Sequence, residues 1–383
     1  MDAKQLLLGR IEALMGDLNR ARIQIDKQAI PESLRKRAGN ELLNTIREEE
    51  EKLREDRRSA EALTASNSAE LLDSWKSFDF HQTSCEKVLR ECLALREGLR
   101  MRAADSPEAE LCEIADALLD ELSGLLPDLQ WKRFSYVAAG ESFTDYTQMI
   151  RLRFPLEDIW NLPTAAHEYG HFLSFRVNPV DKAGAHRKLF DEYLAQETVS
   201  VSDTKWMWLN EFFADIFATW ALGPAFAFTC VLLRFNPVGA WISKDTYHPP
   251  DAQRVIAILK TMERMGDLCG QASQIAKFWD AALASAGQSV PQSQVASSAI
   301  SADAVPKIAG RIYEIIEKGA PDVKFTTWSQ TAYLKEMLNS VPEEVPSFRL
   351  VDLLNAAWRA RLAPMDAGVV SENFLEMWRR KEK

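Results

Sequence analysis

The chain has 383 residues, of which 46% are hydrophobic, and its 56 acidic residues against 46 basic ones give a net charge of −10. This length and hydrophobic content are enough for a folded protein with one large core or several smaller ones. The negative charge excludes a general attraction to nucleic acid or to an anionic membrane surface, so neither is an expected partner.

Cysteine usage and the first residues favour a cytoplasmic protein. The five cysteines are widely spaced and odd in number, and they include no C-x-x-C pair. This pattern predicts reduced thiols rather than a disulfide framework or a cysteine zinc site. The opening sequence MDAKQLLLGRIEALMGDLNR mixes charges into its apolar residues, so it lacks the apolar run of a secretion signal. We therefore expect a reducing, cytoplasmic environment.

Residues 1–130 have the pattern of successive amphipathic helices. Leu7, Ile11 and Leu14 are spaced by four and three residues, which places them on one face of a helix. Similar spacing recurs between residues 111 and 122. The sequence predicts an N-terminal helical bundle, and the outer surface of this bundle is a candidate site for a protein partner.

Residues 131–154 change to a strand-like pattern. They are rich in β-favouring residues, contain the turn signal Ala139-Gly140, and alternate in character from residue 149 to residue 154. This pattern predicts a small hairpin or meander that ends at Pro155. We take residues 131–285 as the central domain, in which this small sheet lies beside the helix that follows.

That next helix carries the sequence HEYGH. Asn161-Leu162-Pro163 predicts its start, and Asn178-Pro179 predicts its end. His167 and His171 are four residues apart, so both imidazoles project from one face and can bind the same ion. Glu168 flanks that face, where its carboxylate can reach a metal-bound water and act as a general base. The motif therefore predicts a zinc site with its own base.

The motif alone leaves two questions open. Histidines at this spacing can also be core residues satisfied by hydrogen bonds, and two histidines leave a catalytic zinc one protein ligand short. A metzincin would have Gly and His where this chain has Ser174 and Val177, so that family is excluded. The polar segment that follows contains four candidate third ligands, each of a type that is usually solvated. They are His186, Asp191, Glu192 and Glu197.

A better third ligand lies in WLNEFFADIFATW, residues 208–220. This segment belongs to a second predicted helix, residues 203–222, which has an Asp at its expected cap and a Gly after its end. Glu211 and Asp215 are four residues apart on one face of this otherwise apolar helix. We take Glu211 as the third metal ligand, and Asp215 as the group that accepts the outer ring N–H of a ligating histidine.

Taken together, His167-Glu168-x-x-His171 and Asn210-Glu211-x-x-x-Asp215 resemble the motifs of the gluzincin zinc peptidases, the thermolysin-like group. In that group the first helix supplies two histidines and the base, and the second supplies the glutamate ligand and the supporting aspartate. The resemblance covers about residues 160–222. It implies a zincin-like core, one Zn²⁺ per chain, and the hydrolysis of a peptide or protein substrate.

Residues 245–255, DTYHPPDAQRV, add candidates for transition-state stabilisation. Thermolysin-like enzymes use a downstream histidine and a tyrosine to donate hydrogen bonds to the carbonyl oxygen, and Tyr247 and His248 are the candidates for these roles. Arg254 is a possible substrate or structural contact. Alternatively, His248 caps the helix that begins near Pro249, and Arg254 pairs with an exposed acid.

Three further segments set the remaining boundaries. Residues 216–233 contain no charge, but Gly223-Pro224 divides them, so we expect a buried helix followed by a second element rather than a membrane span. Residues 286–304 are rich in Ser, Gln and Ala and predict a linker or long loop. Residues 305–383 predict a C-terminal helical segment.

The combined prediction is a mainly α protein of the α+β kind, with a zincin-like core between helical segments that form walls of the cleft or regulate access to it. Its leading function is that of a zinc metallopeptidase, in which His167, His171 and Glu211 bind the metal and Glu168 activates water. The alternative is a non-catalytic helical interaction protein whose metal site is structural or sensory. A membrane-embedded peptidase is the third and least favoured interpretation.

Overall fold

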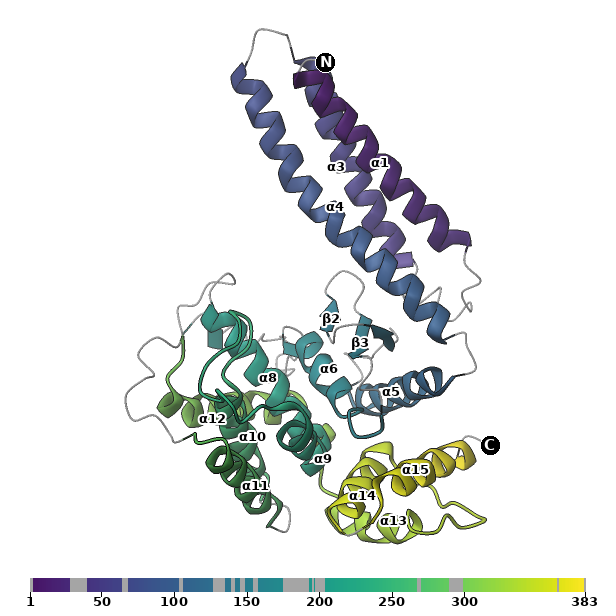
Figure 1. The fold of residues 1–383 in the computed structure, drawn as a ribbon, viewed down its shortest axis with the longest axis vertical. Coiled ribbons are helices and arrows are strands. Elements are labelled where there is room, and N and C mark those ends of the chain that lie inside the picture. Colours follow the sequence, from purple (N-terminus) through teal and green to yellow (C-terminus); the bar gives the residue numbers. More distant parts are fainter. Residues whose placement is uncertain are drawn as a thin grey trace, which may run out of the picture. The chain divides into compact units, whose positions relative to one another are not determined.

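Figure 1 shows the computed structural model of the chain. It describes residues 3–27, 40–63, 68–102, 106–126, 135–138, 142–144, 149–153, 158–174, 193–194, 196, 204–266, 270–288, 299–363 and 365–381. Within these ranges the protein is mainly helical with three short strands, as the sequence predicts. It divides into two compact units, residues 1–112 with 132–154, and residues 113–131 with 155–383.

The first unit is built on three long helices that pack against one another. They are α1 (Ala3–Lys27), α3 (Asn40–Ala62) and α4 (Ser68–Arg102). Leu7, Ile11 and Leu14 of α1 are buried, so the predicted apolar face is confirmed. They share one core with Leu53 of α3 and Val88 of α4. Helix α5 (Pro107–Gly124) begins in this unit and ends in the second.

The first unit also contains a three-stranded sheet of β1 (Ser135–Ala138), β2 (Ser142–Thr144) and β3 (Met149–Arg153). The strand order is β1-β3-β2, with β1 parallel and β2 antiparallel to β3. The predicted hairpin is therefore correct for β2 and β3, but a meander is wrong, because β1 pairs with β3 and not with β2. The turn signal at residues 139–140 lies outside the described residues.

Contacts with α4 and α5 hold this sheet in the first unit. Arg102 Nη1 donates to the Ser135 carbonyl at 2.7 Å, and Ser135 Oγ donates to the Cys112 carbonyl at 3.1 Å. Arg151 forms an ion pair with Glu91 of α4. The strand segment thus belongs to the same compact unit as the N-terminal helices, whereas the sequence assigned it to the central domain. Its predicted place beside the HEYGH helix stays a prediction.

The second unit is arranged around α8 (Thr204–Leu222), which is buried over most of its length. Its most extensive contacts are with four helices: α6 (Thr164–Ser174), α9 (Pro224–Thr229), α10 (Asp251–Arg264) and α12 (Val305–Gly319). The remaining helices of this unit are α11 (Gln271–Ser285), α13 (Thr331–Met337), α14 (Leu350–Leu362) and α15 (Ala367–Lys381). Short helical turns complete it: the π-helical Cys230–Arg234 and the 3-10 turns Ala302–Ala304, Pro321–Val323 and Trp328–Gln330.

The predicted break in the apolar run 216–233 is confirmed. Helix α8 ends at Leu222, and Gly223 adopts φ 58° before Pro224 begins α9. A Cβ at Gly223 would collide with the ring of Phe325, so this position needs glycine both for its backbone and for space. No helix in the described part of the chain has the length and apolar character to cross a membrane.

The C-terminal segment packs onto the same core as α8 and is not a separate unit. Asn355 of α14 accepts a hydrogen bond from the backbone N–H of Ala225 at 3.0 Å and donates to the carbonyl of Leu222 at 2.8 Å. Most of the predicted linker lies outside the described residues, but its end is packed, because Gln253 Nε2 donates to the Ile300 carbonyl at 2.9 Å.

Candidate metal centre

Helices α6 and α8 lie side by side in the second unit and approach very closely at one point (Figure 1). A Cβ at Gly170 of α6 would lie 2.8 Å from Cα and 3.2 Å from Cβ of Ala214 in α8. Only glycine fits at this distance. Because Glu211 lies one turn before Ala214, the close approach brings its carboxylate to the two histidines.

Aromatic packing adds to the contact between α6 and α8. Tyr169 stacks on Phe172 and meets Phe217 of α8 edge-on. The start of α6 differs in detail from the prediction. We expected the Asn161 side chain to cap α6, but its Oδ1 accepts no hydrogen bond in the described part of the chain and its Nδ2 donates to Asp158 Oδ1 at 3.0 Å. The Asn161 carbonyl accepts from the backbone N–H of Thr164 at 2.9 Å.

Three predicted metal ligands meet at one point between α6 and α8. The Nε2 atoms of His167 and His171 are 3.2 Å apart. His167 Nε2 is 3.5 Å from Oε2 of Glu211, and His171 Nε2 is 3.3 Å from its Oε1. Two ligands bonded at ~2.0–2.1 Å to a tetrahedral zinc ion would be about 3.3 Å apart. The donor types and their spacing therefore fit a zinc ion.

Glu168 lies next to this group without joining the three converging donors. Its side chain is buried, and a carboxylate oxygen lies within 4.8 Å of donor nitrogens of both His167 and His171. At this distance the Glu168 carboxylate could reach either a bound ion or a water molecule on it.

Asp215 and Arg254 support His167 from the side away from the three donors. His167 Nδ1 lies 3.0 Å from Oδ1 of Asp215, so its Nε2 is left to face Glu211. Asp215 has no exposed surface, and Arg254 of α10 holds it with two hydrogen bonds of 2.7 Å. Arg254 is itself stacked on Phe235 and lies 3.4 Å from Glu211 Oε2. Its partner is thus a buried acid, not the exposed one that the sequence offered as an alternative.

These contacts control the protonation of the site. Burial disfavours a charged His167, but Asp215 and Glu211 outweigh it and raise the pKa of His167 to about 10. Burial also opposes ionisation of Glu211, yet the charges of His171 and Arg254 hold the pKa of Glu211 well below its usual value. The pKa of Asp215 is likewise lowered against burial, chiefly by Arg254. Both acids are therefore anionic at neutral pH.

His248 also approaches the site, from the segment before α10. Its Nε2 is 3.8 Å from Glu211 Oε1, and its Nδ1 lies 2.9 Å from Asp245 Oδ2. Ser243 Oγ donates to the His248 carbonyl at 2.7 Å and Asp245 Oδ1 accepts from the backbone N–H of His248 at 2.8 Å. The predicted helix-cap role is wrong, because α10 begins at Asp251 with Pro250 as its N-cap. Tyr247 is 59% exposed, and its backbone N–H donates to Asp245.

Sequence reasoning missed three contributors to this site. Gly170 lies inside HEYGH, but this position requires glycine because of the close contact with Ala214 of α8, 44 residues further along the chain. Asp245 had a local signal, because it precedes His248 by three residues and can reach it in a turn. The ring of Phe226 stacks on His167 at 6.1 Å, and no sequence signal pointed to it. The competing ligands at positions 186, 191, 192 and 197 lie outside the described residues.

Comparison of the chain with protein-family models, with curated proteins and with solved structures finds no match.

Proposed function

We propose that the protein is a zinc-dependent peptidase of gluzincin type, with the metal bound by His167, His171 and Glu211. The observation that carries this proposal is the spacing of the three ligating groups, two histidine Nε2 atoms 3.2 Å apart and the two oxygens of one carboxylate at 3.3 and 3.5 Å from them, on two helices held together at Gly170. This spacing matches the separation of about 3.3 Å between ligands of a tetrahedral zinc. Three protein ligands leave the fourth position to water, as in catalytic zinc sites.

A bound zinc ion would polarise the scissile carbonyl and lower the pKa of a water molecule. Glu168 takes the proton from the attacking water and passes it to the amine that leaves. His248 donates a hydrogen bond from Nε2 to the carbonyl oxygen as negative charge develops there, and Asp245 holds the ring through Nδ1. Tyr247 is the second candidate donor to this oxygen.

Asp215 and Arg254 act as positioning residues in this proposal. Asp215 fixes the tautomer of His167 and raises its basicity toward the metal. Arg254 compensates the buried charge of Asp215, and its side chain is only 13% exposed. We therefore assign Arg254 to the support of the ligands and not to a substrate contact.

A structural metal site is the second candidate, and the position of His248 favours it. Its Nε2 lies 3.8 Å from Glu211 Oε1, so a small movement would make it a fourth ligand. Four protein ligands would close the site and leave no position for water. In the catalytic site His248 donates a hydrogen bond to the substrate, whereas in the structural site it binds the metal.

Zinc content and proteolysis of substituted proteins test the proposal. The purified wild type should bind one zinc per chain and degrade casein or members of a mixed peptide library. Glu168→Gln should keep the zinc and lose cleavage, whereas Glu211→Gln should lose both. Glu372→Gln, at an exposed position of α15, is the matched control and should behave as wild type. Equal zinc retention in Glu211→Gln and wild type would contradict the ligand assignment.

His248→Ala separates the catalytic site from the structural one. In the catalytic case the variant keeps zinc at wild-type affinity and loses about 10²–10³-fold in kcat, as expected when an oxyanion donor is removed. A closed site would instead lose zinc affinity. Acetohydroxamate binding to the cobalt-substituted protein gives a second readout, because its visible spectrum changes only if a coordination position is open to the ligand.

A further inference from the structure

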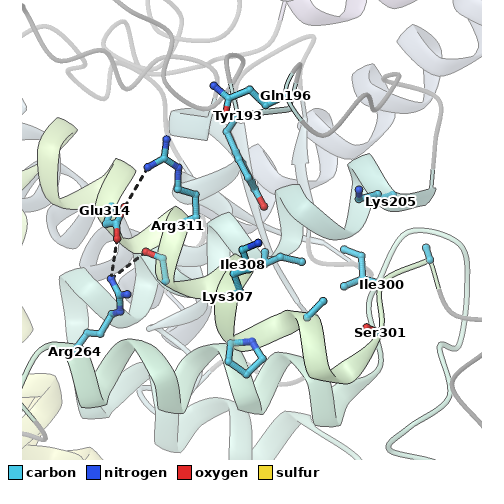
Figure 2. A pocket seen from close by; sticks show the side chains of 14 residues that line it. Tyr193, Gln196, Lys205, Arg264, Ile300, Ser301, Lys307, Ile308, Arg311 and Glu314 are labelled. Carbon is cyan, nitrogen blue, oxygen red and sulfur yellow. Dashed lines mark hydrogen bonds and ion pairs between the residues drawn. The ribbon is translucent and has the colours of Figure 1, made fainter. Parts of the chain in front are cut away.

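The second unit contains a cavity of about 660 Å³ that shares no residue with the candidate metal centre. Figure 2 shows its walls, which come from the first turn of α8, the end of α10, the start and middle of α12, and residues 299–304, together with Tyr193 and Gln196. Cavities of roughly 300–1,000 Å³ are the size that holds small organic ligands.

The charge of this cavity is opposite to that of the chain. Lys205, Arg264, Lys307 and Arg311 line it, and Glu314 is the only acid among its described lining residues. The lining thus carries four positive charges and one negative charge, in a protein with a net charge of −10. Such a concentration of basic groups in a concave site attracts anions.

Glu314 holds two of the basic groups in place. Arg264 Nη1 is 3.5 Å from its Oε1, and Arg311 Nη1 is 3.2 Å from its Oε2, as the dashed lines in Figure 2 mark. Arg264 also donates to the Gly310 carbonyl at 3.1 Å, and its Cζ lies over the ring of Tyr313, 5.4 Å from the ring centroid. A Cβ at position 310 would lie 2.8 Å from Arg264 Nη2, so the glycine makes room for this guanidinium. Contacts with Gly310 and Glu314 thus hold the Arg264 guanidinium at the cavity wall, and Arg311 shares the same acid.

Lys307 and Arg311 place like charges one helical turn apart on α12. Like charges at this spacing repel each other, and Glu314 offsets part of this repulsion through its ion pair with Arg311. Lys205 reaches the cavity from α8 and lies across it from Arg311 in Figure 2. Cations on two walls suit an anion with several acceptor oxygens, which is the property of a phosphate group.

The rest of the lining is apolar or aromatic. Ile300 and Ile308 are buried side chains of the wall, and the Tyr193 ring extends into the space between Arg311 and Lys205 (Figure 2). An inorganic ion would leave this surface and most of the volume unused. From these features we propose that the cavity binds an organic phosphate of nucleotide size, with its phosphate on the basic groups and its body against the tyrosine and isoleucines.

Calorimetric titration with three probes tests the proposal on the full chain. Adenosine monophosphate should bind, inorganic pyrophosphate should bind more weakly, and adenosine should not bind measurably. The titrations use zinc-free protein and the Glu211→Gln variant, so that phosphate cannot bind through the metal centre. Success or failure here is therefore independent of the proposed peptidase function.

Substitutions locate the site. The double variant Lys307→Gln/Arg311→Gln should bind adenosine monophosphate at least about tenfold more weakly than the wild type, since each charged hydrogen bond contributes roughly that factor to the affinity. Both side chains are exposed on α12, so the variant should keep the wild-type circular dichroism spectrum. Lys318→Gln removes one charge from an exposed position near the end of the same helix and should bind as wild type does.

Four results would overturn the proposal. They are no binding of adenosine monophosphate by the wild type, equal affinity in the double variant, an equal loss in Lys318→Gln, and pyrophosphate binding as tightly as adenosine monophosphate.

Discussion

Replacing Gly170 by alanine should disrupt the candidate metal centre through the spacing of two helices. The new Cβ would lie 2.8 Å from Cα of Ala214, whereas carbon atoms in contact are about 3.5–4.0 Å apart. The clash is with backbone, so α8 must retreat from α6 by about 0.7 Å to relieve it. The Glu211 carboxylate moves with it, and its distances from the histidines rise from 3.3 and 3.5 Å to about 4 Å.

Two opposing effects determine the stability of this variant. Alanine is favoured over glycine inside a helix by about 0.5–1 kcal/mol, but overpacking costs about 1–3 kcal/mol. Since the contacted atom cannot rotate away, we expect packing to dominate and the second unit to lose about 0.5–2 kcal/mol. Zinc affinity should fall at least about 10–100-fold, because metal–ligand distances tolerate only about 0.2 Å.

Competition with a chromophoric chelator measures the zinc affinity, and urea unfolding of the zinc-free protein measures stability. Gly9→Ala is the matched control, because a Cβ there meets no atom within 4 Å on α1. It should leave zinc affinity unchanged and add about 0.5–1 kcal/mol to stability. Wild-type zinc affinity in Gly170→Ala, with equal or greater resistance to urea, would refute the proposed spacing.

Four further predictions concern buried charges and thiols. Asp215→Asn should weaken zinc binding about 10–100-fold, because it frees His167 to rotate. It should also destabilise the fold by up to about 3–5 kcal/mol, because Arg254 keeps only its longer contact with Glu211. Chelator competition and urea unfolding measure the two effects. Zinc binding near pH 7 should release a proton, because the pKa of His167 is about 10 in the metal-free site. Calorimetry in buffers of different ionisation enthalpy should detect this release. Its absence would contradict the assignment of His167 as a zinc ligand. In the metal-free protein the same raised pKa stabilises the fold fully below about pH 6.5, and this contribution is lost as the pH rises through 10. Burial raises the pKa of Cys85 and of Cys92 to about 12, so both thiols should resist iodoacetamide at pH 8.5 in the folded protein. Both should react once urea unfolds the protein. Peptide mass spectrometry measures the extent of alkylation at each cysteine.

The sequence predicted those features that depend on local periodicity. Leu7, Ile11 and Leu14 share a buried face because their spacing follows the helical repeat. The i, i+4 pairs on α6 and α8 share a face for the same reason, and Gly223 ends a helix where its neighbours indicate a stop. Each of these inferences needs only one segment of chain.

The missed features depend on contacts between distant segments. Arg254 reaches Asp215 across 39 positions, and nothing near either residue indicates its partner. The strand β1 favours extended structure by composition, but its pairing with β3 depends on long-range contacts, so a meander was the wrong inference. The close contact of Gly170 with Ala214 likewise exists only once two helices have packed. The pairing of strands and the close approach of helices arise only in the folded chain, whereas hydrophobic periodicity can be read from each segment alone.

The buried charges explain why the metal centre needs so many groups that are not ligands. Glu211 and Asp215 are anionic and Arg254 is cationic, so these three largely buried side chains carry one net negative charge. A buried charge without compensation costs several kcal/mol, and a proton on His167 removes it when no metal is bound. An ionised Glu168 beside these groups would give the protonated, metal-free site one net negative charge and the zinc-bound, deprotonated site a net charge of zero. The group proposed to move the proton of the attacking water is thus also the group that balances the metal, which accounts for a buried glutamate beside a ligand set that does not include it.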